Sequence, residues 1–320
     1  MRFAWVVAVI AMLSGSIAPG SVEAAAQKRV AILLFSEEPR YAQGRQGFID
    51  QLNQEGFKEP AVGFFTENAR GSKAKAAELA ESIASGKPDL VFTLGTLATA
   101  PVARLIKHAP IVFSTVYDPV GAEIAQGWKN SGNNTTGCST MVPITAIVKT
   151  LIGLRPVRRL AVLYTPGERN SELPLLQLQK LPTSYGIKVI PVIVTGKEDV
   201  TRIMPEIVRA ADAIYITGSI VLGASVKTIV ATANRANVIT VTHLDDLVDK
   251  GALVGVCADS YRLGRLAGKK AALILRGAKP AALPIEMDRN PDVIVNRTSA
   301  RTGRFSIPAS FMNKVTRFVE

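Results

Sequence analysis

Short strand-like segments alternate with helix-like segments from residue 29 to residue 116. In order along the chain, the predicted strands and helices occupy 29–35, 41–55, 61–65, 72–85, 89–94, 96–107 and 111–116. A series of this β-α-β kind needs a crossover between successive strands, which gives a parallel sheet with helices on both faces. This pattern therefore predicts a doubly wound α/β lobe.

A second alternating series follows residue 138. Its predicted helices occupy 144–154, 173–185, 199–211 and 225–236, and its predicted strands occupy 159–164, 188–194, 213–217 and 238–242. We therefore expect a fold of two doubly wound parallel-sheet lobes joined by a hinge.

The remaining chain contains a long predicted helix, 261–276, and a tail with a strand at 293–296 and a closing helix at 309–318. The simplest path returns to the first lobe near residues 256–259. We expect lobe 1 to comprise 25–137 and about 258–290, and lobe 2 to comprise 138–257 with part of the tail.

The first 24 residues have the pattern of a signal peptide. Arg2 precedes an unbroken apolar run, 5–13, and small residues lead to a cleavage point before Ala25. This run is too short to span a bilayer as an anchor. No cysteine lies near the cleavage point, so a lipid-anchored form is not expected. We expect a mature protein that is soluble in a bacterial periplasm and does not itself span the membrane.

The chain is strongly basic, with 38 Lys and Arg against 26 Asp and Glu and a net charge of +12. Such a balance can indicate nucleic-acid binding when the basic residues cluster. Here no run of Lys and Arg is longer than two residues. The pattern favours a solvated basic surface that docks on an acidic partner, and not a nucleic-acid site.

Sequence signatures of enzymes are scarce. His108 and His243 are the only histidines, and the chain contains no HExxH, GxSxG, GxxxxGK[ST] or Cys/His cluster with metal spacing. We expect no catalytic residue, no metal and no cofactor. An exported enzyme that uses His243 with Asp118 is the weaker alternative.

The most informative single position is Asp118, which follows the apolar strand 111–116 and precedes Pro119. Open α/β sheets bind ligands beyond the carboxyl ends of their strands. A carboxylate at this place can bind a cationic group, or it can cap the following turn. Tyr117, like Phe113 and Tyr164, can supply an aromatic wall, although strand aromatics usually belong to the core.

Small polar residues follow other predicted strands. Thr96 follows the strand 89–94 at a helix N-terminus, where backbone N–H groups can hold a carboxylate. The segment 164–171, Ser219 and His243 occupy corresponding places in the second lobe. Each of them can be a simple cap. Together, facing one another from two lobes, they predict a cleft for a small polar molecule.

Cys138 and Cys257 are the only cysteines, and each lies near a predicted crossing between the lobes. If the two crossings run side by side, a disulfide can join them in an oxidising compartment. The alternative is two buried thiols that act as small apolar side chains.

Several segments together resemble the ABC transporter substrate-binding proteins, whose members include aromatic amino-acid binders. The matching segments are TVYDPVGA at 115–122, NTTG at 134–137, PGERNS at 166–171, DSYRLGR at 259–265 and ILRGAKP at 274–280. The resemblance covers nearly the whole mature length and implies a fold like that of type I periplasmic binding proteins.

The resemblance also implies a role: two lobes that close on an amino acid or related compound and deliver it to an inner-membrane ABC permease. It places Asp118 in the cleft, where it can hold an amino group, and it places Thr96, Asn170 and Ser171 where a ligand's polar end is expected. After the strand 213–217 the family often carries an acidic or amide pair, whereas this chain has Gly218-Ser219-Ile220. Either Asp118 holds the ligand's positive end alone, or the ligand has none. A ligand sensor for a membrane receptor kinase is the alternative role.

Overall fold

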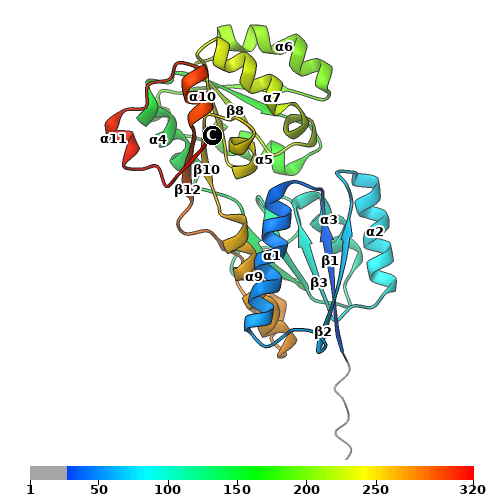
Figure 1. The fold of residues 1–320 in the computed structure, drawn as a ribbon. Coiled ribbons are helices and arrows are strands. Elements are labelled where there is room, and N and C mark those ends of the chain that lie inside the picture. The colour runs from blue at the N-terminus through cyan, green and yellow to red at the C-terminus, as the bar shows by residue number, and fades with distance from the viewer. Residues whose placement is uncertain (1–26) are drawn as a thin grey trace, which may run out of the picture.

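Six strands form the sheet of the first lobe in the computed structural model, which describes residues 27–320 (Figure 1). The strand order is β11-β5-β4-β3-β1-β2, and all neighbouring strands are parallel. The bounds are β1 Lys28–Leu34, β2 Val62–Asn68, β3 Leu90–Leu94, β4 Ile111–Val116, β5 Thr135–Ser139 and β11 Glu286–Met287. The predicted signal peptide, 1–24, lies outside the described residues.

Helices cover this first sheet. They are α1 Pro39–Gln54, α2 Lys73–Ser85, α3 Thr96–Leu105 and α9 Ser260–Leu275, with a short 3₁₀ turn, η2, at Pro280–Ala282. The central strands β3 and β4 are buried along their whole length, as expected for strands covered on both faces.

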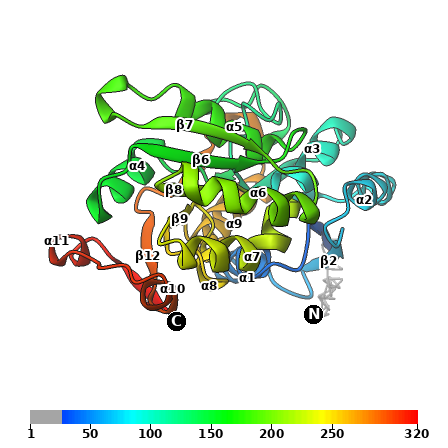
Figure 2. The ribbon, with the colours of Figure 1, turned by 90° about the horizontal axis from the view of Figure 1, so that it is seen from above.

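Seven strands form the sheet of the second lobe, in the order β13-β12-β10-β9-β8-β6-β7. Their bounds are β6 Arg159–Tyr164, β7 Lys188–Ile193, β8 Ala213–Ile216, β9 Ile239–Thr242, β10 Val254–Cys257, β12 Asp292–Asn296 and β13 Arg317–Val319. All neighbours are parallel except β12, which runs antiparallel to β10. Figure 2 shows this order from above, from β7 at one edge toward β12.

The helices of the second lobe are α4 Ile144–Leu154, α5 Arg169–Gln179, α6 Lys197–Ala210, α7 Ile220–Arg235, α8 Asp245–Asp249, α10 Arg297–Thr302 and α11 Ala309–Met312, with a 3₁₀ turn, η1, at Thr183–Tyr185. Successive residues of β6 belong to different cores. Leu160 and Val162 pack in one cluster, and Ala161 and Leu163 pack in the other. The sheet is therefore a layer between two hydrophobic cores, and the predicted two-lobed α/β fold is confirmed.

Three chain segments connect the two sheets: 140–143, 258–259 and 288–291. The return through 258–259 brings α9 back to the first lobe, where it packs beside α1 (Figure 1). The chain then crosses once more, so that β12 and β13 complete the second sheet.

The structure corrects two predicted helices. The closing helix predicted at 309–318 is wrong, because α11 ends at Met312 and residues Arg317–Val319 form β13 beside β12. Pairing with an exposed sheet edge satisfies backbone groups that a short terminal helix would leave to solvent. The helix predicted from 225 begins at Ile220, because the Ser219 hydroxyl caps it by accepting from the Leu222 N–H at 3.4 Å.

The two cysteines lie in different sheets and are not joined by a disulfide. Cys138 belongs to β5 of the first lobe and Cys257 to β10 of the second, and both are free and buried. Burial raises the pKa of the Cys138 thiol to about 12. They are apolar core side chains, and the disulfide alternative is wrong.

Candidate functional site

A cavity lies between the two lobes, at the carboxyl ends of strands from both sheets. Five residues singled out from the sequence line it: Thr96, Tyr117, Asn170, Ser219 and His243. Six further residues with polar side chains line it as well: Glu38, Arg40, Tyr41, Thr115, Thr140 and Glu168. Its apolar surface comes mainly from Phe35, Leu97, Ile220 and Leu244.

Asp118 does not line this cavity. Its Oδ1 accepts hydrogen bonds from the N–H groups of Val120 at 3.1 Å and Gly121 at 2.9 Å. The carboxylate therefore caps the turn after β4, which is the second of the two roles that its position in the sequence allowed. The sequence predicted a ligand contact for Asp118, but Asp118 is not among the residues of the cavity wall.

Ser171 also lies outside the cavity wall. Its hydroxyl is fully buried, accepts from the Thr165 N–H at 3.0 Å and lies 2.5 Å from the Thr217 hydroxyl. These contacts join the ends of β6 and β8. The aromatic side chains of Phe113 and Tyr164 belong to the hydrophobic cores.

His243 is buried between two tyrosines. Its Nδ1 lies 2.7 Å from the Tyr215 hydroxyl, and its ring meets the ring of Tyr117 edge-on with centroids 4.7 Å apart. Burial lowers the pKa of His243 to about 3, and the charge of Arg40 adds to this shift. The imidazole is therefore neutral at physiological pH.

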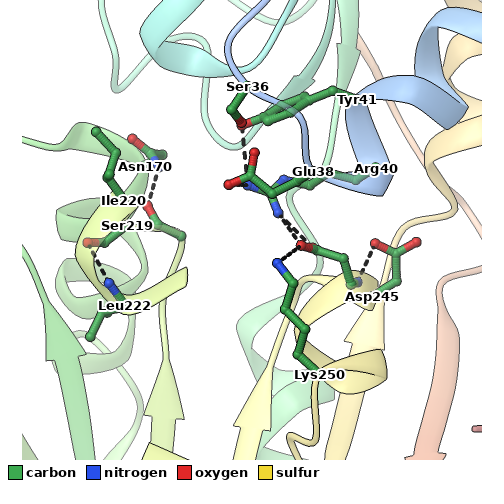
Figure 3. A network of polar contacts seen from close by, with 12 residues as sticks. Ser36, Glu38, Arg40, Tyr41, Asn170, Ser219, Ile220, Leu222, Asp245 and Lys250 are labelled. Carbon is green, nitrogen blue, oxygen red and sulfur yellow. Dashed lines mark hydrogen bonds and ion pairs between the residues drawn. The ribbon is translucent and has the colours of Figure 1, made fainter. Parts of the chain in front are cut away.

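One ion pair joins the lobes beside the cavity. Arg40, in the first turn of α1, places Nη1 2.7 Å from both carboxylate oxygens of Asp246 in α8. Burial alone would raise the pKa of Asp246, but the charges of Arg40 and Lys250 outweigh it and lower this pKa. Lys250 lies 3.2 Å from the same carboxylate (Figure 3).

Other contacts cross between the lobes around the cavity. The Lys73 ammonium lies 3.5 Å from the Glu168 carboxylate, and the Arg169 guanidinium donates to the carbonyl of Gly121 at 2.8 Å. The Tyr117 hydroxyl donates to Gln177 at 2.8 Å. These contacts join residues of the two lobes around the cavity.

A second charged cluster lies at the connecting segments. Arg262 donates to Asp288 at 2.9 Å and to Asp292 at 3.1 Å, while the N–H of Asp259 donates to Asp288 at 3.1 Å. Two of the three crossings, 258–259 and 288–291, are thereby bound to the start of α9.

No group of three or more His, Cys, Asp or Glu among residues 27–320 is placed to hold a metal ion. No helix in the same part of the chain is both long enough and apolar enough to cross a membrane.

The family model described as "ABC transporter substrate binding protein" matches residues 29–317. This chain belongs to that family. The match spans both lobes and all three crossings, so the resemblance seen in the sequence is confirmed. Proteins of this family bind solutes, and they are not enzymes.

Two similar proteins match most of the chain. The chain is 23% identical over 277 residues to a tyrosine-binding protein of Clostridioides difficile, covering 86% of this chain and 80% of that protein. A conserved domain protein of Vibrio cholerae is 27% identical, with a TM-score of 0.84 and coverage of 91% of this chain and 99% of that one.

Two further structures share the fold. One is an ABC domain of Streptococcus pneumoniae in complex with L-Trp, with a TM-score of 0.85 and 24% identity over 92% of this chain and 100% of that one. The other is the ligand-free, open structure of a Clostridium difficile substrate-binding protein with adhesive properties. It has a TM-score of 0.74 and 24% identity over 92% of this chain and 100% of that one.

Proposed function

We propose that this protein is the extracytoplasmic solute-binding component of an ABC importer and that it captures an amino acid or a related compound between its lobes by hinge closure. The observation that carries the proposal is the interlobe cavity, to which both lobes contribute polar and aromatic side chains. A ligand that touches both lobes stabilises the closed arrangement over the open one.

The contacts around the cavity support a closed arrangement. The Arg40–Asp246 pair, the Lys73–Glu168 pair and the Tyr117–Gln177 hydrogen bond all join residues of different lobes. None of them can persist if the lobes separate. The higher TM-score to the L-Trp complex than to the ligand-free, open structure agrees with this arrangement.

The lining fits a small molecule with a polar head and a partly apolar body. Hydroxyl, amide and carboxyl groups occur in the same wall as Tyr41, Tyr117 and Leu97. This mixture is typical of small-molecule sites, where a few polar groups orient a ligand held by apolar surface. Tyrosine and L-Trp, the ligands of two similar proteins, have this character.

The test is to identify what the protein binds. Mass spectrometry of ligand released from the purified protein, followed by thermal-shift and calorimetric titration with the common L-amino acids, should reveal an amino acid bound one to one. Small-angle scattering should show a smaller radius of gyration with ligand than without it. A protein that no amino acid stabilises would contradict the proposed ligand class.

Export and delivery need their own measurements. We propose a periplasmic location after cleavage near residue 24, which N-terminal sequencing of the exported protein tests. Loss of uptake of the identified ligand in a strain without this protein tests the importer role. If that strain still takes up the ligand but no longer responds to it, the role of a ligand sensor for a membrane receptor kinase is favoured instead.

A further inference from the structure

Four polar atoms at the cavity have no hydrogen-bond partner within the described part of the chain. They are Glu38 Oε2, Thr96 Oγ1, Thr115 Oγ1 and Asn170 Oδ1, and each is buried. A buried polar atom without a partner costs free energy, so native proteins rarely keep several together. Their grouping around one cavity indicates that a bound ligand supplies the missing partners.

Two of these atoms can only accept hydrogen bonds, and they come from different lobes. Glu38 precedes α1 in the first lobe, and Asn170 lies in α5 of the second. In Figure 3 the Glu38 carboxylate points toward the space that separates it from Asn170 and Ser219. The Asn170 amide nitrogen is already used, because it donates to the Gly218 carbonyl. Its oxygen is left for a donor on the ligand.

Arg40 does not supply that donor to Glu38. Its Nη1 makes two contacts of 2.7 Å to Asp246, and its Nη2 lies 3.8 Å from the other Glu38 oxygen, Oε1. The charge of Arg40 is thus matched mainly by Asp246. A ligand ammonium is the group whose charge and three N–H donors suit the remaining acceptors.

The other two atoms, Thr96 Oγ1 and Thr115 Oγ1, lie at a wall of the cavity that offers hydrogen-bond donors. Thr96 is the first residue of α3, a ten-residue helix, and its side chain is buried with 6% of the residue exposed. The first N–H groups of a helix have no carbonyl partner within it and carry partial positive charge. A carboxylate is the group that such a wall binds best.

Backbone geometry supports a binding role for this wall. Thr115 has a φ of 59°, a left-handed conformation that a β-branched residue rarely adopts, at an irregularity in the pairing of β4 with β5. Strained residues of this kind concentrate at ligand sites. Gly95, with a φ of 98°, precedes α3, and a Cβ there would lie 2.9 Å from the Tyr41 ring.

We infer that the cavity selects a zwitterion, with Glu38 and Asn170 as acceptors for the ammonium group and Thr96 with the α3 N-terminus as the holder of the carboxylate. The inference rests on the proposed function and adds the residues that set its specificity. It assigns the ammonium to Glu38, and not to Asp118, which caps a turn.

Calorimetric titration with two sets of matched probes tests this assignment. One set is L-tyrosine, tyramine and 3-(4-hydroxyphenyl)propionate, and the other is L-tryptophan, tryptamine and 3-indolepropionate. Glu38→Gln should weaken the binding of the amino acids and the amines roughly ten- to a hundredfold, because a charged hydrogen bond is lost where an ammonium is present. The binding of the desamino acids should not change. Thr96→Val should weaken the binding of the amino acids and the desamino acids, and the binding of the amines should not change.

Glu37→Gln is the matched control. Glu37 is exposed, accepts from Asn68 at 2.9 Å and does not line the cavity, so its variant should bind all probes like the wild type. A Glu38→Gln protein with wild-type affinity for L-tyrosine and L-tryptophan would overturn the assignment and leave the proposed function standing. Wild-type protein that binds the amines or the desamino acids as tightly as the amino acids would overturn the selection of a zwitterion, whereas only a wild type that none of the common L-amino acids stabilises would also overturn the proposed ligand class. Circular dichroism and melting temperature verify that each variant is folded.

Discussion

At the scale of single residues, the same side-chain types cap turns and line the cavity, and only their partners distinguish the two roles. Asp118, Ser171 and Ser219 all follow strands. Asp118 Oδ1 and the Ser171 hydroxyl accept hydrogen bonds from neighbouring backbone N–H groups, and neither residue lines the cavity. Ser219 caps α7 and also lines the cavity.

The buried His243 makes stability depend on pH. Its pKa is about 3 in the folded protein, against about 6.5 in an unfolded chain. Between these values the unfolded state binds a proton that the folded state does not. This site's contribution to the free energy of unfolding therefore decreases as pH falls through that window, by roughly 1.4 kcal/mol per pH unit.

His243→Gln should remove this dependence. Urea unfolding between pH 7.5 and pH 5 should show a smaller loss of stability in the variant than in the wild type. The exposed His108 provides the control, because His108→Gln should keep the wild-type slope. Equal slopes in all three proteins would contradict a neutral buried imidazole.

At the scale of secondary-structure elements, the close packing of α1 on α9 joins the returning chain to the first lobe. The two helices approach so closely that a Cβ on Gly264 of α9 would collide with the Gly44 carbonyl of α1. Gly264→Ala should lower the free energy of unfolding by roughly 1–3 kcal/mol, because the helices must separate.

Gly223 in α7 is the matched control for this substitution. A Cβ at Gly223 meets nothing within 4 Å, so Gly223→Ala should raise the free energy of unfolding by roughly 0.5–1 kcal/mol through the better helix propensity of alanine. Denaturant unfolding of both variants gives the comparison. A neutral Gly264→Ala would contradict the close approach of the helices.

Element boundaries were predictable where a cap or a long apolar run marked them. The helix predicted at 261–276 corresponds to α9, which Asp259 caps by accepting from Arg262 at 2.6 Å. The tail was not predictable in this way. The three residues of β13 depend on pairing with β12, and no local periodicity marks such a short strand.

At the scale of the whole molecule, we expect the Arg40–Asp246 pair, which joins the two lobes, to favour the closed arrangement. Arg40→Met keeps the length of the side chain but leaves the buried Asp246 with only Lys250 as partner. Loss of one member of a buried pair costs roughly 3 kcal/mol, and lobe opening relieves this cost by hydrating Asp246. We expect a larger radius of gyration in small-angle scattering and weaker ligand binding.

Arg276→Met serves as the control for this whole-molecule effect. Arg276 pairs with Glu55 at 3.0 Å, and both residues lie in the first lobe. Its loss should leave the scattering profile unchanged. If Arg40→Met scatters like the wild type, the ion pair does not contribute to closure.

The sequence by itself determined the fold class, the two lobes and several residues of the cavity wall. Alternating apolar runs predict parallel strands, and strand ends predict where polar residues meet, which identified Thr96, Asn170, Ser219 and His243. The same rule applied to the end of β1 would have found Glu38 and Arg40, which follow that strand by a few residues.

Only the tertiary structure decided how those residues are used. Whether a carboxylate caps a turn or faces a cavity depends on contacts between residues distant in sequence, such as Arg40 with Asp246, 206 positions apart. The cysteines show the same limit, since their positions in the sequence allowed a disulfide and the structure has both as free, buried thiols in different sheets. Local patterns specify which segments form strands and helices, whereas the partners of a side chain depend on how those segments pack.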